Sequence, residues 1–97
     1  ITGGGFYENI PRMLPEGVNA HMDLGSYEVP AIFKLMQKTG NIADDMMYNT
    51  FNMGIGMCVV VPADQVELAI ATLKDNDIDA YVIGEIIAGE DKVQLED

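Results

Sequence analysis

Hydrophobic residues recur at two spacings along this chain, and the two spacings predict helices that alternate with strands. The i, i+3, i+4, i+7 spacing of an amphipathic helix appears around Pro30 and again over Pro62–Asn76. Shorter helices are predicted over Phe6–Met13 and Asn41–Asn49. The stripes expected to face the core are Val29, Ile32, Phe33 and Met36 in the first long helix and Val66, Ala69, Ile70 and Leu73 in the second.

Period-two alternation and β-branched runs predict the strands, which are Val18–Leu24, Met53–Val61, Asp79–Ile87 and Lys92–Leu95. In the first strand Ala20 and Met22 share one side, and His21 lies on the other, exposed side. The second half of Met53–Val61 is apolar on both faces, which is typical of a strand at the centre of a sheet.

The order of these elements predicts an α/β (α+β) sandwich, a mixed sheet with helices that is partly ferredoxin-like. The strand Met53–Val61, the helix after it and the strand Asp79–Ile87 are expected to form a parallel βαβ crossover or part of the ferredoxin-like arrangement. With 97 residues the chain is long enough for one domain, residues 1–97, and too short for two.

Composition and charge narrow the classes of function. A hydrophobic fraction of 48% fits a folded domain, and no apolar run approaches the roughly 20 residues of a membrane span. Five basic against 16 acidic residues give a net charge of −11, which repels nucleic acid and anionic membranes. The single cysteine, Cys58, excludes an internal disulfide, fits a reducing cytosol and is expected to be a small buried hydrophobe.

Three consecutive glycines follow Thr2 and precede the first predicted helix. Glycine lets the backbone adopt positive φ, and such a turn aims N–H groups at one point, where the helix dipole favours an anion. Gly3, Gly4 and Gly5 therefore predict a phosphate-binding loop, and the alternative is a flexible terminal tail. Because the chain is acidic, a phosphate would depend on local amides and Arg12, or on basic residues elsewhere in the protein.

A second glycine pair, Gly54 and Gly56, falls inside the predicted strand Met53–Val61. Glycine weakens a strand interior unless another group must approach closely, so the pair indicates a ligand on the strand, a β-bulge or a closely packed helix. The pairing of Asp44 and Asp45 suggests a metal site or acid/base chemistry, but dipole compensation in the first turn of a helix is favoured. We expect no metal site in this chain.

The glycine motifs resemble one enzyme family along essentially the whole chain. The residues that carry the resemblance are Thr2-Gly3-Gly4-Gly5-x-x-Glu8-Asn9-Ile10-Pro11-Arg12, then Pro30-x-x-Phe33, then Thr50-Phe51-Asn52-Met53-Gly54-Ile55-Gly56-Met57. They are similar to the C-terminal half of the phosphoribosylformylglycinamidine cyclo-ligase (AIR synthetase) family of purine biosynthesis. Since the chain begins with Ile1, directly before this motif, we expect it to be a fragment of a longer, two-domain protein.

The resemblance implies a ligase that uses ATP and Mg2+ to close the imidazole ring of aminoimidazole ribotide from formylglycinamidine ribotide. It also implies a cytoplasmic homodimer whose N-terminal domain holds most of the ATP and magnesium site and forms a cleft with this half. The isolated fragment is expected to be inactive. Carried onto this sequence, the substrate- or phosphate-binding residues are Thr2, Gly3, Gly4, Gly5, Asn9, Arg12, Asn52, Gly54 and Gly56, and catalytic residues are left unassigned. Arg12 could instead pair with Glu8, one helical turn back.

The chain departs from the family pattern at several positions. The family has a histidine just before the threonine, a tryptophan where Tyr27 stands, an acid–Met pair at Met46-Met47 and an arginine at Asn49. No role is therefore assigned to Tyr27, Met46 or Asn49. The alternatives are a relative of formylglycinamidine ribotide synthetase, selenophosphate synthetase or thiamine-monophosphate kinase, or a regulatory module that binds a small anion without catalysis.

Overall fold

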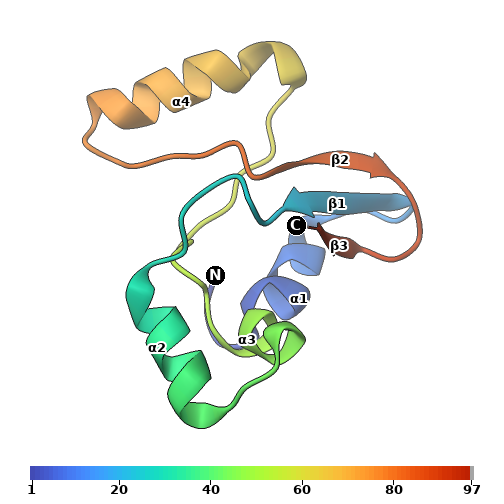
Figure 1. Ribbon diagram of the computed structural model, residues 1–97. Helices are drawn as coiled ribbons and strands as arrows, with labels where there is room; N and C mark the ends of the chain where they lie inside the picture. The colour runs from blue at the N-terminus through green and yellow to red at the C-terminus, as the bar shows by residue number, and fades with distance from the viewer. Residues whose placement is uncertain (97) are drawn as a thin grey trace.

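A three-stranded mixed sheet, ordered β2-β1-β3, joins the two ends of the chain in the computed structural model, which describes residues 1–96 (Figure 1). The strands are β1 (Val18–Asp23), β2 (Gly84–Ala88) and β3 (Val93–Glu96). Strand β1 pairs antiparallel with β2, so that Val18 lies opposite Ala88, and parallel with β3, so that Ala20 lies opposite Val93. The predicted strand Val18–Leu24 is thus confirmed as β1, and it occupies the centre of the sheet, the position that the sequence predicted for Met53–Val61.

Four α-helices accompany this sheet within the described residues, which makes the fold mixed α/β. The helices, with two short 3-10 segments, are α1 (Gly5–Asn9), η1 (Ile10–Met13), α2 (Ala31–Gly40), α3 (Asp44–Thr50), η2 (Ala63–Gln65) and α4 (Val66–Asp75). The predicted first helix is divided because Pro11, which lacks an N–H, lies at the start of η1. Asp44 and Asp45 lie in the first turn of α3, where carboxylates stabilise the positive end of the helix dipole.

The buried core is built from the first 55 residues. Phe6, Ile10, Ala20, Met22 and Ile55 form one cluster, to which α1, η1, β1 and the loop after α3 contribute. As predicted, Ala20 and Met22 share the inner side of β1. His21 lies on the other side, where its Nε2 is 3.2 Å from Oε2 of Glu96.

One polar residue, Asn19, is buried at the junction of the two halves of the chain. Its side chain is 1% exposed, and its Oδ1 accepts a 2.8 Å hydrogen bond from the backbone N–H of Lys92. The N–H of Ala20 donates to the carbonyl of Lys92, also at 2.8 Å. These bonds satisfy polar groups that would otherwise be costly to bury, and they hold β3 in register with β1.

The predicted strand Met53–Val61 is wrong for this structure. Met53 and Gly54 form a turn with φ values of 55° and 95°, and the residues after them form no strand. Of the predicted strand Asp79–Ile87, only the C-terminal end forms a strand of the sheet, which is β2. The predicted parallel crossover between them is therefore absent. The run Met53–Val61 pairs with no strand within residues 1–96, and the outer edges of β2 and β3 stay free.

The apolar stripes of the long helices are not buried either. Helices α2 and α4 contain no buried residue, and Ile32 of the predicted stripe is 54% exposed. Phe33 packs on the ring of Phe51, with 6.1 Å between ring centroids. The helical spacing thus predicted the helices correctly but not what covers them, because a three-stranded sheet is too small to cover both.

We expect Gly5→Ala to destabilise the fold far more than Gly17→Ala. Both residues have positive φ, 61° and 83°, which costs a non-glycine residue about 1–2 kcal/mol. A Cβ on Gly5 would also collide with the backbone oxygen of Tyr48 and lie 2.7 Å from that of Phe51, whereas nothing lies within 4 Å at Gly17. Overpacking adds about 1–3 kcal/mol. Denaturant unfolding of both variants measures this difference, and equal losses would contradict it.

Candidate functional site

The glycine loop at the start of the chain is held in place by the side chain of Asn9. Asn9 Nδ2 donates to the carbonyl oxygens of Gly5 at 2.9 Å, Thr2 at 3.2 Å and Gly3 at 3.3 Å. The N–H of Gly5 also donates to the carbonyl of Thr2, at 3.1 Å, and closes the turn. The loop is therefore an ordered turn, and the alternative of a flexible tail does not describe it.

This arrangement leaves two N–H groups of the loop available. A trans peptide holds a carbonyl and the following N–H on opposite sides, so the N–H groups of Gly3 and Gly4 point away from Asn9. Within residues 1–96 neither N–H has an acceptor. Gly3 is exposed, and no atom lies within 4 Å of the place where its Cβ would stand. The loop thus offers two donors to an acceptor from outside.

Asn9 also gathers the other polar residues predicted for this site. Its Oδ1 accepts hydrogen bonds from Thr2 Oγ1 and from Arg12 Nη1, each at 3.3 Å. Arg12 is exposed, and it donates to Asn9 rather than pairing with Glu8, the alternative that the helical spacing suggested. The guanidinium therefore lies beside the loop, where it adds positive charge.

The second glycine motif forms a tight turn instead of a strand. Asn52 Oδ1 accepts a 2.8 Å hydrogen bond from the N–H of Gly54, and the carbonyl of Asn52 accepts from Ile55 at 3.0 Å. A Cβ on Gly54 would lie 2.6 Å from Cδ of Pro30, so this glycine is required for packing. Gly56 is exposed and has no atom within 4 Å of its Cβ position.

The two glycine motifs lie side by side. The backbone nitrogen of Ile1 donates to the carbonyl of Gly56. At the other end of the loop, Gly5 packs against the backbone of Tyr48 and Phe51, directly before Asn52. Two turns that are about 50 residues apart in sequence therefore present their open glycines, Gly3 and Gly56, from neighbouring segments.

Tyr27 supports the second turn, a role that the sequence gave no reason to assign. Its hydroxyl donates to the carbonyl of Met53 at 3.0 Å, and its ring packs on Tyr81, with 5.7 Å between centroids. Burial raises the pKa of the Tyr27 hydroxyl, and the charges of Tyr48 and Cys58 raise it further. Burial likewise raises the pKa of the Cys58 thiol, which packs half-buried against the core and fits its expected apolar role.

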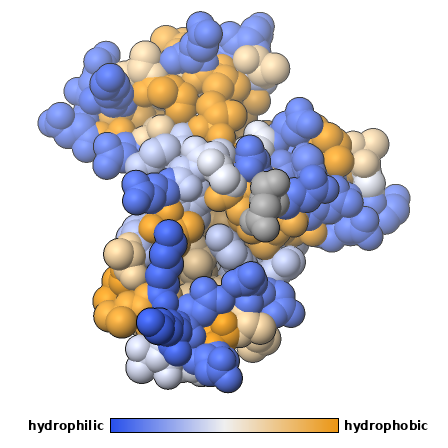
Figure 2. Space-filling view, viewed as in Figure 1, coloured by the Kyte–Doolittle hydropathy of each residue, from blue (hydrophilic) through white to orange (hydrophobic). Residues whose placement is uncertain are grey.

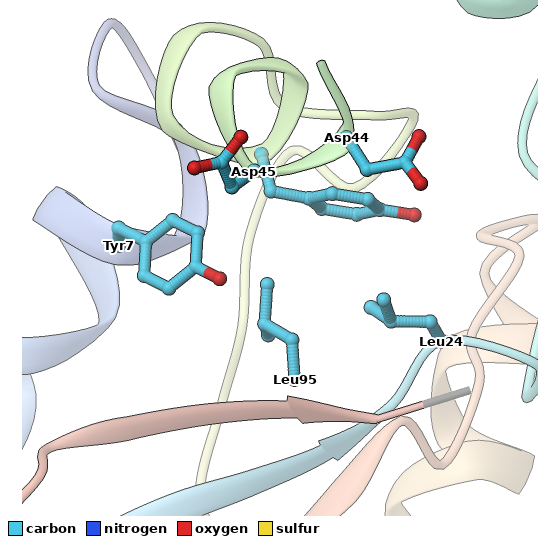
Figure 3. A pocket seen from close by; sticks show the side chains of 6 residues that line it. Tyr7, Leu24, Asp44, Asp45 and Leu95 are labelled. Carbon is cyan, nitrogen blue, oxygen red and sulfur yellow. The ribbon is translucent and has the colours of Figure 1, made fainter.

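A cavity of about 330 Å³ lies elsewhere, between α1, α3 and one end of the sheet (Figure 3). Figure 3 shows Tyr7 on one side, Asp44 and Asp45 above, and Leu24 and Leu95 below. Asp44 Oδ1 accepts a 2.6 Å hydrogen bond from Gln37 Nε2. Because carboxylates repel anions, this cavity is unsuited to a phosphate, whereas the glycine turns and Arg12 are suited to one.

The described part of the chain also bears on metal binding and on membrane insertion. No group of three or more His, Cys, Asp or Glu side chains within residues 1–96 is arranged to hold a metal ion. None of the helices in that range combines the length and the hydrophobicity that a membrane crossing requires.

Comparison with known proteins places this chain in a family. Residues 1–96 match the family described as "AIR synthase related protein, C-terminal domain", and the chain belongs to that family. It is 54% identical over 93 residues to the phosphoribosylformylglycinamidine cyclo-ligase of Shouchella clausii and 55% identical over 95 residues to that of Lachnospira eligens. These alignments cover 96% and 98% of this chain but only 27% and 28% of the relatives.

The homology is therefore to the C-terminal part of the cyclo-ligases, which are enzymes of purine biosynthesis. The enzyme from Staphylococcus saprophyticus gives the same result, with 54% identity over 95 residues and 28% of its length covered. The resemblance inferred from the glycine motifs is confirmed. The chain spans little more than a quarter of the curated relatives that it matches.

We expect Asn9→Ala to destabilise the glycine loop by about 1–3 kcal/mol, because it leaves several backbone and side-chain groups without their partner. Asn9→Asp should cost at least as much, since it places a carboxylate against three carbonyl oxygens. Asn76→Ala is the matched control, because Asn76 Nδ2 makes one exposed hydrogen bond, to the carbonyl of Thr72. Denaturant unfolding of the three variants checks the order, and an Asn76 loss as large as that of Asn9 would refute it.

Tyr27→Phe should remove about 1 kcal/mol of stability at neutral pH through its lost hydrogen bond. The pKa of Tyr27 is raised above the value of about 10 that it has in the unfolded chain. The stabilisation that the protonated Tyr27 hydroxyl contributes to the fold is thus fully present below about pH 10, and it is lost as the pH rises further. Stability curves from pH 7 to 11 should fall less steeply for Tyr27→Phe than for the parent, while exposed Tyr7→Phe should follow the parent.

Proposed function

We propose that this chain, residues 1–97, belongs to the C-terminal domain of a phosphoribosylformylglycinamidine cyclo-ligase, and that it binds phosphate groups through its two glycine turns. The observation that carries the proposal is the identity of about 54% to several such enzymes along nearly the whole chain. The complete domain would be an α/β sandwich, partly ferredoxin-like, that faces an N-terminal domain of the same polypeptide across a cleft. The intact enzyme would be a cytoplasmic homodimer.

In the proposed reaction the ring closes after the formyl oxygen of formylglycinamidine ribotide has been phosphorylated. ATP transfers its γ-phosphoryl group to that oxygen and leaves as ADP. An amidine nitrogen then attacks the formyl carbon, and the C–O bond breaks to release phosphate and aminoimidazole ribotide. The activation is needed because an amide oxygen is a poor leaving group until it carries a phosphoryl group.

The residues of this chain would bind and orient phosphate during these steps. The N–H groups of Gly3 and Gly4 are free to donate, and Asn9 holds the loop that presents them. Arg12 would add positive charge, which matters in a chain of net charge −11. Thr2 and Gly5 shape this loop, while Asn52, Gly54 and Gly56 would line the same site from the second turn.

ATP and Mg2+ would be bound mostly by the rest of the enzyme. The described residues contain no set of side chains suited to a metal ion, so we assign no magnesium ligand to this chain. The 97-residue chain by itself would then be inactive, because it lacks the surface that completes the cleft.

The proposal predicts that the full-length enzyme releases ADP only when formylglycinamidine ribotide is supplied. Gly3→Val and Gly56→Val should each lower kcat/KM by about 10-fold or more, since the added methyl groups would occupy the space of a bound phosphate. Both positions are open and neither has positive φ, so these variants should keep the unfolding midpoint of the parent.

Ala88→Val is the matched control, because it adds the same methyl groups on an exposed edge of β2. Gly4 and Gly54 are less suitable, since their positive φ and close neighbours would confound folding with binding. Absence of ribotide-dependent ADP release in the parent would overturn the proposed reaction. Unchanged turnover in both glycine variants would retain the reaction and remove these turns from the phosphate site.

A further inference from the structure

The second half of the chain has no core of its own. Buried residues occur between Gly5 and Ile55, and none occurs among residues 57–96. The large hydrophobic side chains of this half are instead exposed, for example Met57 at 81%, Val59 at 65% and Leu68 at 68%. Figure 2 shows hydrophobic surface over the upper part of the molecule, where α4 lies. Exposed apolar surface of this kind marks a docking site.

The segment Met57–Val61 is the centre of this surface. It is drawn out between the core and η2, and none of its backbone N–H or C=O groups has a hydrogen-bond partner within residues 1–96 (Figure 1). Cys58 packs against the core, whereas Val59 and Val60 are exposed. A β-branched run with unpaired backbone groups has the chemistry of a strand that lacks its neighbour.

We propose that in the complete enzyme the remaining polypeptide docks on this surface and adds a β-strand to Met57–Val61. This inference rests on the proposed function, because the occupant is the part of a cyclo-ligase that precedes the portion matched here. The relatives supply enough chain, since the alignments cover only 27–28% of their length. Strand addition would pair the backbone groups of every second residue in the run, and side chains of the docked polypeptide would pack on the exposed valines.

Charge favours this occupant over a second copy of the same surface. Acidic residues surround the exposed valines and α4, among them Asp64, Glu67 and Asp75, against one lysine, Lys74, on the helix. Two copies of a chain with net charge −11 would bring these carboxylates together. The docking strand should therefore be apolar, with Lys or Arg at its flanks, where these carboxylates can pair with it.

Hydrogen exchange of the full-length enzyme tests the proposal directly. We expect those amides of residues 59–61 that face the docked strand to exchange at least about 100-fold more slowly than in an unstructured peptide, because docking gives them partners. Protection should not depend on protein concentration. Exchange at the unstructured rate would overturn the docking, and protection that appears only as concentration rises would replace the proposed occupant with a second copy.

A matched pair of substitutions adds a second readout. Val60 and Ile32 are each 54% exposed in this structure. Val60→Lys should lower the Tm of the full-length enzyme by about 5 °C or more and abolish protection at residues 59–61, since it places a charge among the apolar side chains of the docked polypeptide. Ile32→Lys, on α2, should leave both unchanged. Equal effects of the two variants would contradict the docking site.

The two proposals fail in different ways. Ribotide-dependent ADP release together with unprotected amides at residues 59–61 would retain the cyclo-ligase function and overturn the docked strand. Protected amides without ribotide-dependent release would retain the docked strand and overturn the function.

Discussion

The close approach of α1 to the end of α3 determines most of the structure around the site. Gly5 begins α1 directly against the backbone oxygens of Tyr48 and Phe51, where no side chain would fit. Because the two backbones meet at this point, Phe6 and Ile10 reach the core, and the glycine loop stays beside the turn that follows Phe51. The function proposed for the two glycine turns depends on that contact, which acts together with the hydrogen bond from Ile1 to Gly56 to hold the turns side by side.

Two side chains then make the arrangement specific. Asn9 binds three carbonyls of the first turn and accepts from Thr2 and Arg12, so that one amide organises the whole loop. Tyr27 plays the corresponding part for the second turn through Met53. The glycines themselves divide into two kinds. Gly5 and Gly54 are required by packing, whereas Gly3 and Gly56 are open, so that only the open pair can report on a ligand.

The contrast between the two halves of the chain bears on its place in a larger enzyme. The first 55 residues bury a cluster of side chains, and the remaining residues contribute partly buried edges such as Ile83, Val93 and Leu95. An apolar helix and a valine run without cover are costly to expose to water. Their exposure agrees with a chain that matches little more than a quarter of its relatives and takes part in a larger fold.

The sequence by itself determined the helices, the central strand β1 and the family. Helical spacing, proline and glycine positions and short motifs are local properties, so α2, α4 and the ordered glycine loop could be predicted from them. The contributions of Asn9 to the loop and of Tyr27 to Met53 could not, because they depend on which segments meet. Only the tertiary structure decided strand pairing and burial, because a strand such as Met57–Val61 forms only when another segment, distant in sequence, supplies its hydrogen bonds.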